Sequence, residues 1–157
     1  MDSILLSNGR LGIPEALIHA HDALRAGLTR AAAESGQVGR AAKQIAQLCA
    51  PHFAQEEEDI FRLFGLLHDL ATERVRPDMR AALPMITELA ARRDASRSHH
   101  RMIDAAIEEL LLQSRKGANL AAARVAHALR DHERDEDEGM YPTMLSIDQS
   151  LRESLGL

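Results

Sequence analysis

Two short segments of the 157-residue sequence each carry a histidine followed four positions later by a glutamate. One pair is His52 and Glu56, and the other is His132 and Glu136. On a helix, residues four positions apart lie on one face, about 6 Å from each other, so both side chains can reach a single metal ion. The two segments therefore predict helices that bind metal.

A further histidine precedes each segment at a matched distance. His21 lies 31 positions before His52, and His100 lies 32 positions before His132. The same two-helix unit is thus used twice, and its halves are predicted to pack about a pseudo-twofold axis. Two histidines from each half would then hold one metal ion, and Glu56 and Glu136 near the axis would bridge both ions.

An ordinary buried network of histidines and glutamates is the alternative to a metal centre. All six residues lie on the apolar stripes of their predicted helices. Burying them without partners would cost several kcal/mol for each unmatched group, which a small protein does not tolerate. A hydrogen-bonded network could satisfy some of these groups, but it gives no reason for the matched intervals. The sequence therefore favours a metal centre.

The donor types limit the metal. Imidazole and carboxylate ligands without thiolate suit iron, manganese or zinc. An open, carboxylate-bridged pair with histidine caps is chiefly useful for redox and diatomic chemistry. We therefore expect two non-haem iron ions with an oxo or hydroxo bridge, and manganese or zinc as the other candidates.

The spacing of apolar residues predicts an all-α protein, an antiparallel up-down-up-down four-helix bundle. A loop at residues 9–12 leads into a first helix from Pro14, and residues 35–39 end that helix. The second helix reaches residue 67, and residues 74–78 form a linker that a short helical turn could follow. A third helix begins at Pro84, and residues 116–119 form a turn. The fourth helix is predicted to end near Pro142, because proline cannot continue a helix, and residues 143–155 form a short fifth helix.

Composition excludes several classes of protein. The net charge is −5, which gives no electrostatic support to a nucleic-acid partner. The sequence has one cysteine and no stretch with the roughly 20 apolar residues of a membrane span, and the apolar run at its start is too short for a signal peptide. We expect a cytoplasmic protein without a membrane partner, made of one domain over residues 1–157 with a bundle core at about 13–144. No protein partner can be named.

At this point the sequence resembles the hemerythrin family, in particular its HHE cation-binding branch, over residues 13–144. The similarity is carried by His21-x-x-Leu-Arg, His52-Phe-x-x-Glu-Glu, His100-x-x-Ile and His132-x-x-x-Glu, with Ile60-Phe61 and Met140-Tyr141 following the glutamates. It implies a four-helix bundle with a non-haem di-iron centre. It also implies that one iron is held by His21 and His52, the other by His100 and His132, and that the glutamates bridge them.

The sequence departs from the oxygen carriers of this family at one step. Those proteins have a fifth histidine in a His-x-x-x-His step, but the positions four residues from His100 are Ser96 and Asp104. The sequence is therefore more similar to members linked to nitric oxide, peroxide or the repair of iron centres. Asp137 fits the His-x-x-x-x-Asp step of the carriers and is the alternative to Glu136, which internal symmetry favours.

The expected function is thus binding of, or reaction with, oxygen, nitric oxide or peroxide. The alternatives are a reversible oxygen carrier and a peroxide-decomposing enzyme, and the sequence does not decide whether the protein is an enzyme.

Several other residues are expected to lie outside the ligand set. His19, His68, His99 and His127 are off the ligand stripe, Tyr141 is expected to pack, and Cys49 is expected to be a buried thiol. Glu57, Glu58, Asp135 and Glu138 are expected in a solvated face or as hydrogen-bonding partners of the ligating histidines. Asp104 is expected beside His100 as a hydrogen-bonding group, with ligation as the lesser alternative.

Overall fold

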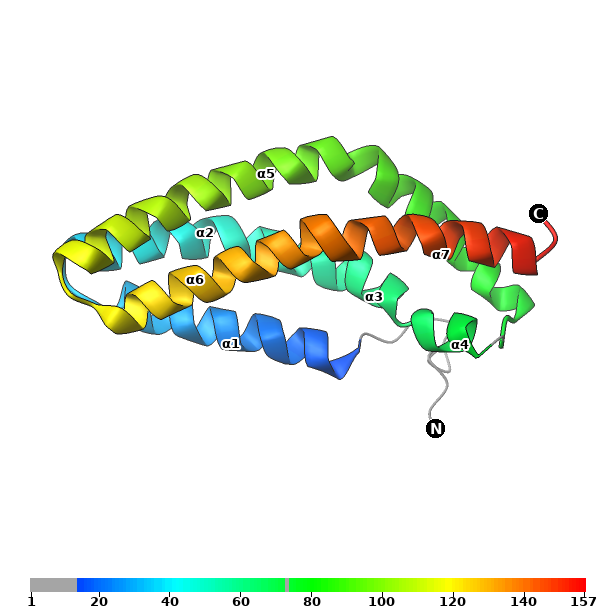
Figure 1. The fold of residues 1–157 in the computed structure, drawn as a ribbon, viewed down its shortest axis with the longest axis horizontal. Helices are drawn as coiled ribbons and strands as arrows, with labels where there is room; N and C mark the ends of the chain where they lie inside the picture. Colours follow the sequence, from blue (N-terminus) through cyan, green and yellow to red (C-terminus); the bar gives the residue numbers. More distant parts are fainter. Residues whose placement is uncertain (1–13, 73) are drawn as a thin grey trace.

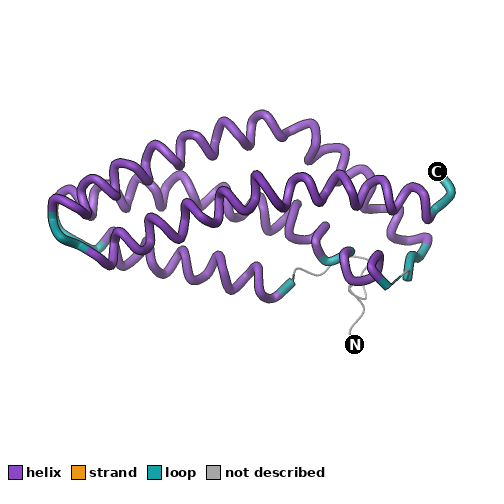
Figure 2. The backbone as a smooth tube through the Cα atoms, viewed as in Figure 1, coloured by secondary structure: helices purple, strands orange, loops and turns teal. Residues whose placement is uncertain are grey.

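Four long helices lie side by side along one axis in the computed structural model, which describes residues 14–72 and 74–157 (Figure 1). They are α1 (Glu15–Ala32), α2 (Gly36–Glu58), α5 (Ala82–Lys116) and α6 (Leu120–Asp135). Figure 2 shows that the described part of the chain is helical with short connections and has no strand. The predicted all-α four-helix bundle is confirmed. The loop expected at residues 9–12 lies outside the described residues.

Short elements complete the chain at the end of the bundle away from the tight turns. After α2 come α3 (Ile60–Phe64) and α4 (Leu67–Ala71), and the 3₁₀ turn η1 (Pro77–Ala81) leads into α5. The π-helical segment η2 (Glu136–Met140) follows α6 directly and continues into α7 (Tyr141–Ser154). The predicted turn after the linker is therefore present as η1. The predicted fifth helix is present as α7, which packs against α3, α4 and α5.

Two expected helix ends are wrong, and both lie just after a glutamate of the repeat. The second helix was expected to run to residue 67, but it breaks at Asp59, whose backbone angles (φ −108°, ψ −86°) are not helical. The Asp59 carboxylate there accepts hydrogen bonds from Gln55 and Arg92. The break turns the chain so that Ile60 and Phe61 are fully buried.

The fourth helix was expected to stop near Pro142, but it continues without interruption into α7. The Tyr141 N–H bonds to the Glu136 carbonyl, five residues back instead of four. This wider π turn places Pro142 within the first turn of α7, where its missing N–H is tolerated.

The apolar core is divided into two clusters. One lies between α1, α2, α5 and α6 and includes Ile45, Phe53, Ile107 and Leu129. The other joins α3, η1, the start of α5 and α7, and includes Ile60, Phe61, Leu83, Ile86, Ile147 and Leu151. The buried polar residues of the four long helices include His21, His52 and His100. These histidines lie on α1, α2 and α5, respectively. Within the described residues, no helix is long and apolar enough to cross a membrane.

Candidate metal centre

The structure brings all six residues of the repeat into one buried cluster. His21 comes from α1, His52 and Glu56 from α2, His100 from α5, His132 from α6, and Glu136 from the first position of η2. Their ligand atoms form two groups, and within each group the atoms all lie within 4.8 Å of one another. The two glutamates belong to both groups. The groups are His21, Glu56, His132 and Glu136, and His52, Glu56, His100 and Glu136.

The histidines are paired across the two halves of the repeat. His21 Nε2 lies 3.0 Å from His132 Nε2, and the rings of His52 and His100 are 4.7 Å apart. Two ligands bound at right angles to one ion, each at about 2.1 Å, are themselves about 3.0 Å apart. The expected pairing of His21 with His52 and of His100 with His132 is therefore wrong. Helix adjacency alone does not decide the pairing, because α1 and α5 each pack against both α2 and α6. The direction in which each histidine side chain points decides it.

Each glutamate presents one carboxylate oxygen to each histidine pair. Glu56 Oε2 lies 3.4 Å from His21 Nε2, and its Oε1 lies 3.0 Å from His52 Nε2. Glu136 Oε1 lies 2.9 Å from His132 Nε2, whereas its Oε2 lies 3.8 Å from the Nε2 atoms of both His52 and His100. This is the arrangement of two carboxylates that bridge two positions.

Carboxylates outside the cluster lie against the Nδ1 atoms of two imidazole rings, one through a hydrogen bond and one as an ion-pair contact. His21 Nδ1 donates to Glu57 Oε1 over 2.9 Å, and Arg25 holds the same oxygen at 2.7 Å. Asp137 Oδ2 lies 3.2 Å from His100 Nδ1. A carboxylate on Nδ1 selects the tautomer whose Nε2 lone pair is free, and this is the usual support of a ligating histidine. Both Nε2 atoms accordingly face the cluster.

The aromatic neighbours fix the His21 ring further. Its centroid lies 4.1 Å from that of Phe53, in a stacked arrangement, and 4.5 Å from that of Phe61. The His21 side chain is fully buried. Burial, with the neighbouring His132, lowers the pKa of His21 to about 4, so its imidazole is neutral and available as a ligand near pH 7.

The remaining charges in the cluster are strongly coupled. Burial alone would lower the pKa of His52, but Glu133 and Glu56 raise it to about 10. Burial and repulsion from Glu136 raise the pKa of Glu56, whereas the neighbouring His132 and Glu56 side chains overcome burial and lower the pKa of Glu136 to about 2. Without metal, the proton on His52 therefore offsets part of the negative charge in the cluster.

Hydrogen bonding leaves this cluster incomplete in a way that fits metal ions. The buried atoms without a hydrogen-bond partner among the described residues include His52 Nε2 and both carboxylate oxygens of Glu56 and Glu136. An unmatched buried carboxylate is costly, and a bound cation removes that cost. The donor set of nitrogens and oxygens is one that iron, manganese and zinc accept.

A comparison with known families settles the identity of the fold. The profile of the hemerythrin HHE cation-binding domain matches residues 12–144, which include all six clustered residues. The chain belongs to the hemerythrin family. No curated protein and no solved structure matches it significantly. The expected resemblance is confirmed, and the hemerythrin bundle carries a buried His/Glu metal site.

Ser96, one of the two positions four residues from His100, lies beside the centre of this hemerythrin domain. Its Oγ lies 3.5 Å from His100 Nε2 and shares a 2.6 Å hydrogen bond with the Tyr141 hydroxyl. Tyr141, expected as a packing residue, is buried as expected, but its hydroxyl also reaches toward the centre. Burial raises the pKa of Tyr141 to about 12, so the hydroxyl keeps its proton.

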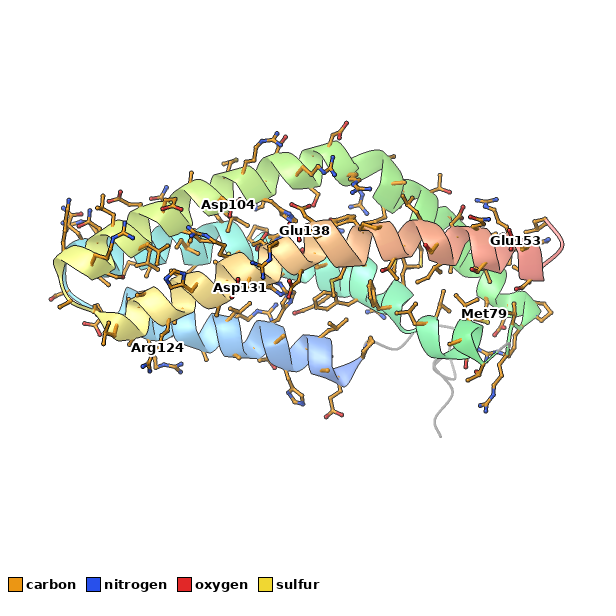
Figure 3. All side chains as sticks on the ribbon, viewed as in Figure 1. Met79, Asp104, Arg124, Asp131, Glu138 and Glu153 are labelled. Carbon is orange, nitrogen blue, oxygen red and sulfur yellow. The ribbon has the colours of Figure 1, made fainter. Side chains whose placement is uncertain are left out.

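The structure also distinguishes Glu136 from Asp137, the two acidic candidates in η2. Glu136 is 1% exposed and lies in the cluster, whereas Asp137 is outside it against His100 Nδ1. Asp104 is exposed on α5 and Glu138 is exposed on η2, both on the outside of the bundle (Figure 3). The expected contact of Asp104 with His100 is therefore wrong, because the helix directs its side chain outward.

The histidines predicted to lie off the ligand stripe stay outside the cluster wherever they are described. His19 pairs with Glu15 at the surface, His127 is exposed, and His99 Nε2 donates to the Leu48 carbonyl over 3.1 Å. The side chain of His68 lies outside the described part. Cys49 is 1% exposed, and burial raises the pKa of its thiol, as expected for a structural cysteine.

Four acidic residues were expected either in a solvated face or as hydrogen-bonding partners of the ligating histidines. Glu57 is such a partner, because it accepts a hydrogen bond from His21. Glu58, Asp135 and Glu138 are exposed.

Sequence reasoning missed one residue of the cluster, Glu133. It is 3% exposed, and its Oε2 lies 3.3 Å from the Nε2 atoms of both His52 and His100. The sequence held a weak signal, because Glu133 lies four positions after Leu129, on the buried side of its helix. The adjacent His132 fits the repeat, whereas Glu133 does not.

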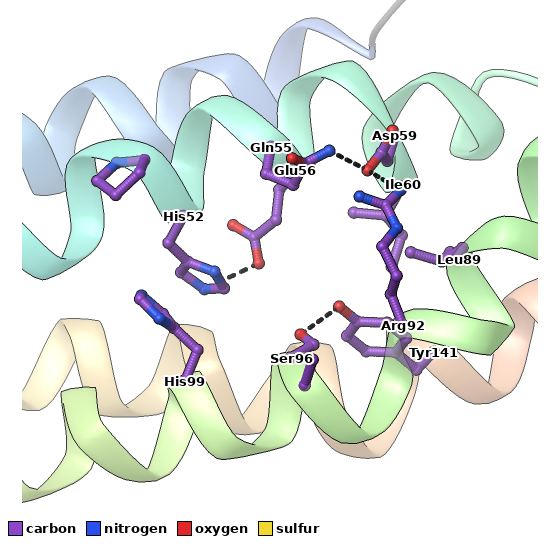
Figure 4. A pocket seen from close by; sticks show the side chains of 12 residues that line it. His52, Gln55, Glu56, Asp59, Ile60, Leu89, Arg92, Ser96, His99 and Tyr141 are labelled. Atoms are coloured by element: carbon purple, nitrogen blue, oxygen red, sulfur yellow. Dashed lines mark hydrogen bonds and ion pairs between the residues drawn. The ribbon is translucent and has the colours of Figure 1, made fainter.

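A pocket of about 290 Å³ opens beside the centre. Figure 4 shows His52, Glu56, Ser96 and Tyr141 on its walls, with His52 directed at Glu56. Ile60 and Leu89 supply apolar lining, and the ion pair between Arg92 and Asp59 (2.7 Å) closes one side. The pocket gives a small molecule access to the His52 side of the cluster.

Metal binding by this hemerythrin domain is expected to release protons. At pH 7, His52 (pKa about 10) holds a proton that a metal ion must displace, and the raised pKa of Glu56 favours release of a further proton, whereas His21 (pKa about 4) is already neutral. The apparent affinity should therefore rise with pH, about tenfold per unit for each displaced proton, until His52 loses its proton near pH 10. Calorimetric titration with Zn²⁺ in buffers of different ionisation enthalpy counts these protons. An affinity that stays constant between pH 6 and pH 8 would contradict the assigned charges.

Proposed function

We propose that this hemerythrin domain binds a carboxylate-bridged pair of iron ions. The proposed ligands are His21 and His132 on one ion, His52 and His100 on the other, and Glu56 and Glu136 on both. The supporting observation is that each glutamate directs one oxygen to each histidine pair. Iron is preferred over manganese and zinc because a carboxylate-bridged pair that leaves positions for an outside molecule suits redox chemistry.

The proposed activity is binding of, or reaction with, a small oxidant: oxygen, nitric oxide or peroxide. Two iron ions would supply the electrons that a bound oxidant takes up. The protein residues would admit the molecule through the pocket beside His52 and Glu56, and the apolar side chains of Ile60 and Leu89 would limit the water that enters with it. The protonated Tyr141 hydroxyl, hydrogen-bonded to Ser96, is placed to donate a hydrogen bond to a molecule in this pocket.

Reversible oxygen carriage is the less favoured alternative. Neither position four residues from His100 carries the histidine of a carrier, and the Ser96 hydroxyl is engaged by Tyr141. The carboxylate-rich centre that remains fits stress response, sensing or the repair of iron centres better. A peroxide-decomposing enzyme is the second candidate, because the pocket would bring peroxide to the centre beside a proton donor. A cytoplasmic location is part of this proposal, and the single buried cysteine is compatible with it.

The test is to load the protein with iron under anaerobic conditions and to record absorption after adding oxygen, nitric oxide or peroxide. Two irons per chain and rapid spectral change with nitric oxide or peroxide support the proposal. A stable oxygen adduct that disappears under vacuum would show a carrier instead, and sustained oxygen evolution from peroxide would show the enzyme. One zinc ion per chain after purification without added metal would contradict the di-iron proposal. Tyr141→Phe, with Ser96 retained, is the matched variant and should slow the reaction without changing the iron content.

A further inference from the structure

Glu133 is a third buried carboxylate in contact with the cluster, and the family repeat does not contain it. Both of its carboxylate oxygens are buried without a hydrogen-bond partner among the described residues. Its Oε2 lies at the same distance, 3.3 Å, from the Nε2 atoms of His52 and His100. These are the two nitrogens that face one proposed ion, so this oxygen approaches that ion, although Glu133 lies outside the four-residue group whose ligand atoms are all within 4.8 Å of one another.

Helix geometry explains why the consecutive residues His132 and Glu133 approach different pairs of histidines. Adjacent positions on an α-helix are rotated by about 100°. His132 therefore faces His21 on α1, with 3.0 Å between their Nε2 atoms, while Glu133 faces the histidines of α2 and α5. Within the described part of the chain, Glu133 makes no ion pair with His21 or His132. The carboxylate thus approaches one side of the centre only.

We propose that Glu133 is a terminal ligand of the metal ion held by His52 and His100. This inference rests on the two-metal centre proposed above. That ion then has five protein ligands: two imidazole nitrogens and one oxygen each from Glu56, Glu136 and Glu133. The ion between His21 and His132 has four, so the two metal positions are unequal although the repeat that builds them is symmetric.

The charge balance supports ligation over a purely structural ion pair. Glu56, Glu133 and Glu136 carry up to three negative charges at no more than 4% exposure. Two divalent cations carry four positive charges, and one bridging hydroxide with the three carboxylates neutralises them.

The test compares Glu133→Gln with the wild-type chain by anaerobic titration with Co²⁺, whose visible absorption grows as its coordination number falls. Wild type should bind two ions. In the variant, one ion should bind roughly 10–100-fold more weakly and absorb more strongly, while the other keeps its affinity. Glu138→Gln is the matched control, because it removes the same charge from an exposed position five residues along. Glu133→Asp keeps the charge on a shorter side chain and should give an intermediate affinity.

The metal-free proteins provide a second readout that distinguishes a ligand from a structural residue. A ligand role predicts that Glu133→Gln loses part of the rise in Tm caused by Co²⁺, whatever the loss of its contact with His52 does to the metal-free Tm. A lower metal-free Tm with an unchanged Co²⁺-dependent rise would overturn the proposal, as would wild-type affinity and spectrum in the variant. If wild type bound one ion only, the two-metal centre would be wrong, and Glu133 would still be judged by the difference between the variants.

Discussion

Loading both metal positions should raise the Tm of this protein by roughly 15–30 °C. At a free metal concentration 1,000 times Kd, each site contributes about 4 kcal/mol, and 1 kcal/mol corresponds to about 2–4 °C for a chain of this size. The physical cause is the set of buried carboxylate oxygens on Glu56, Glu133 and Glu136, which have no hydrogen-bond partner among the described residues and would be neutralised by coordination to a bound cation. The metal centre therefore accounts for a large part of the stability of the bundle.

Scanning calorimetry of the chelator-treated and metal-loaded proteins measures this effect directly. A variant with His21→Ala and His132→Ala should keep about half of the rise, because the position between His52 and His100 remains. His127→Ala is the control, since it removes an exposed histidine from the same helix as His132. Equal melting temperatures with and without metal would show that the cluster is a hydrogen-bonded network rather than a metal centre.

Replacing Glu56 by alanine should abolish the metal pair. Glu56 Oε2 faces His21 and its Oε1 faces His52, so one substitution removes an oxygen ligand from both positions at once. We expect the number of bound ions to fall from two to one or none. Ferric ions that are bridged couple magnetically and are silent in conventional EPR, so the variant loaded with iron should gain the signal of an isolated ferric ion.

Glu57→Gln is the neighbouring control for this substitution. Glu57 contacts His21 Nδ1 and Arg25 but presents no oxygen to a metal position. The Glu57→Gln variant should retain two bound ions. Its affinity for metal should be lower by roughly 10–100-fold, because the His21 ring loses its orienting partner. Two coupled irons in Glu56→Ala would contradict the bridging arrangement.

The four long helices, and six of the residues that meet between them, can be predicted from the sequence. Apolar residues at three- and four-residue intervals define the four long helices, and His52–Glu56 and His132–Glu136 lie on those stripes. A helix places positions four apart on one face whatever packs against it, so each His–Glu pair is a local property. The matched intervals to His21 and His100 then give the repeat.

The helix ends after each glutamate could not be predicted in this way. Periodicity continued through Asp59, where the chain turns, and Pro142 signalled a stop that the π turn at residues 136–140 avoids. Both features depend on hydrogen bonds made to other parts of the chain or over an unusual number of residues. Propensity describes neither of them.

The pairing of the ligands at the centre is the feature that the sequence could least predict. The amino-acid order specifies an all-α bundle and a set of four histidines and two glutamates, because helical periodicity is local and each stripe must be buried. Which histidines face each other depends on how the helices are rotated and placed in the bundle, since α1 and α5 each have both α2 and α6 as neighbours. The same packing directs Glu133 at His52 and His100. Contacts between side chains more than 30 positions apart are set by the tertiary arrangement, so the pairing of the ligands and the third carboxylate became visible only there.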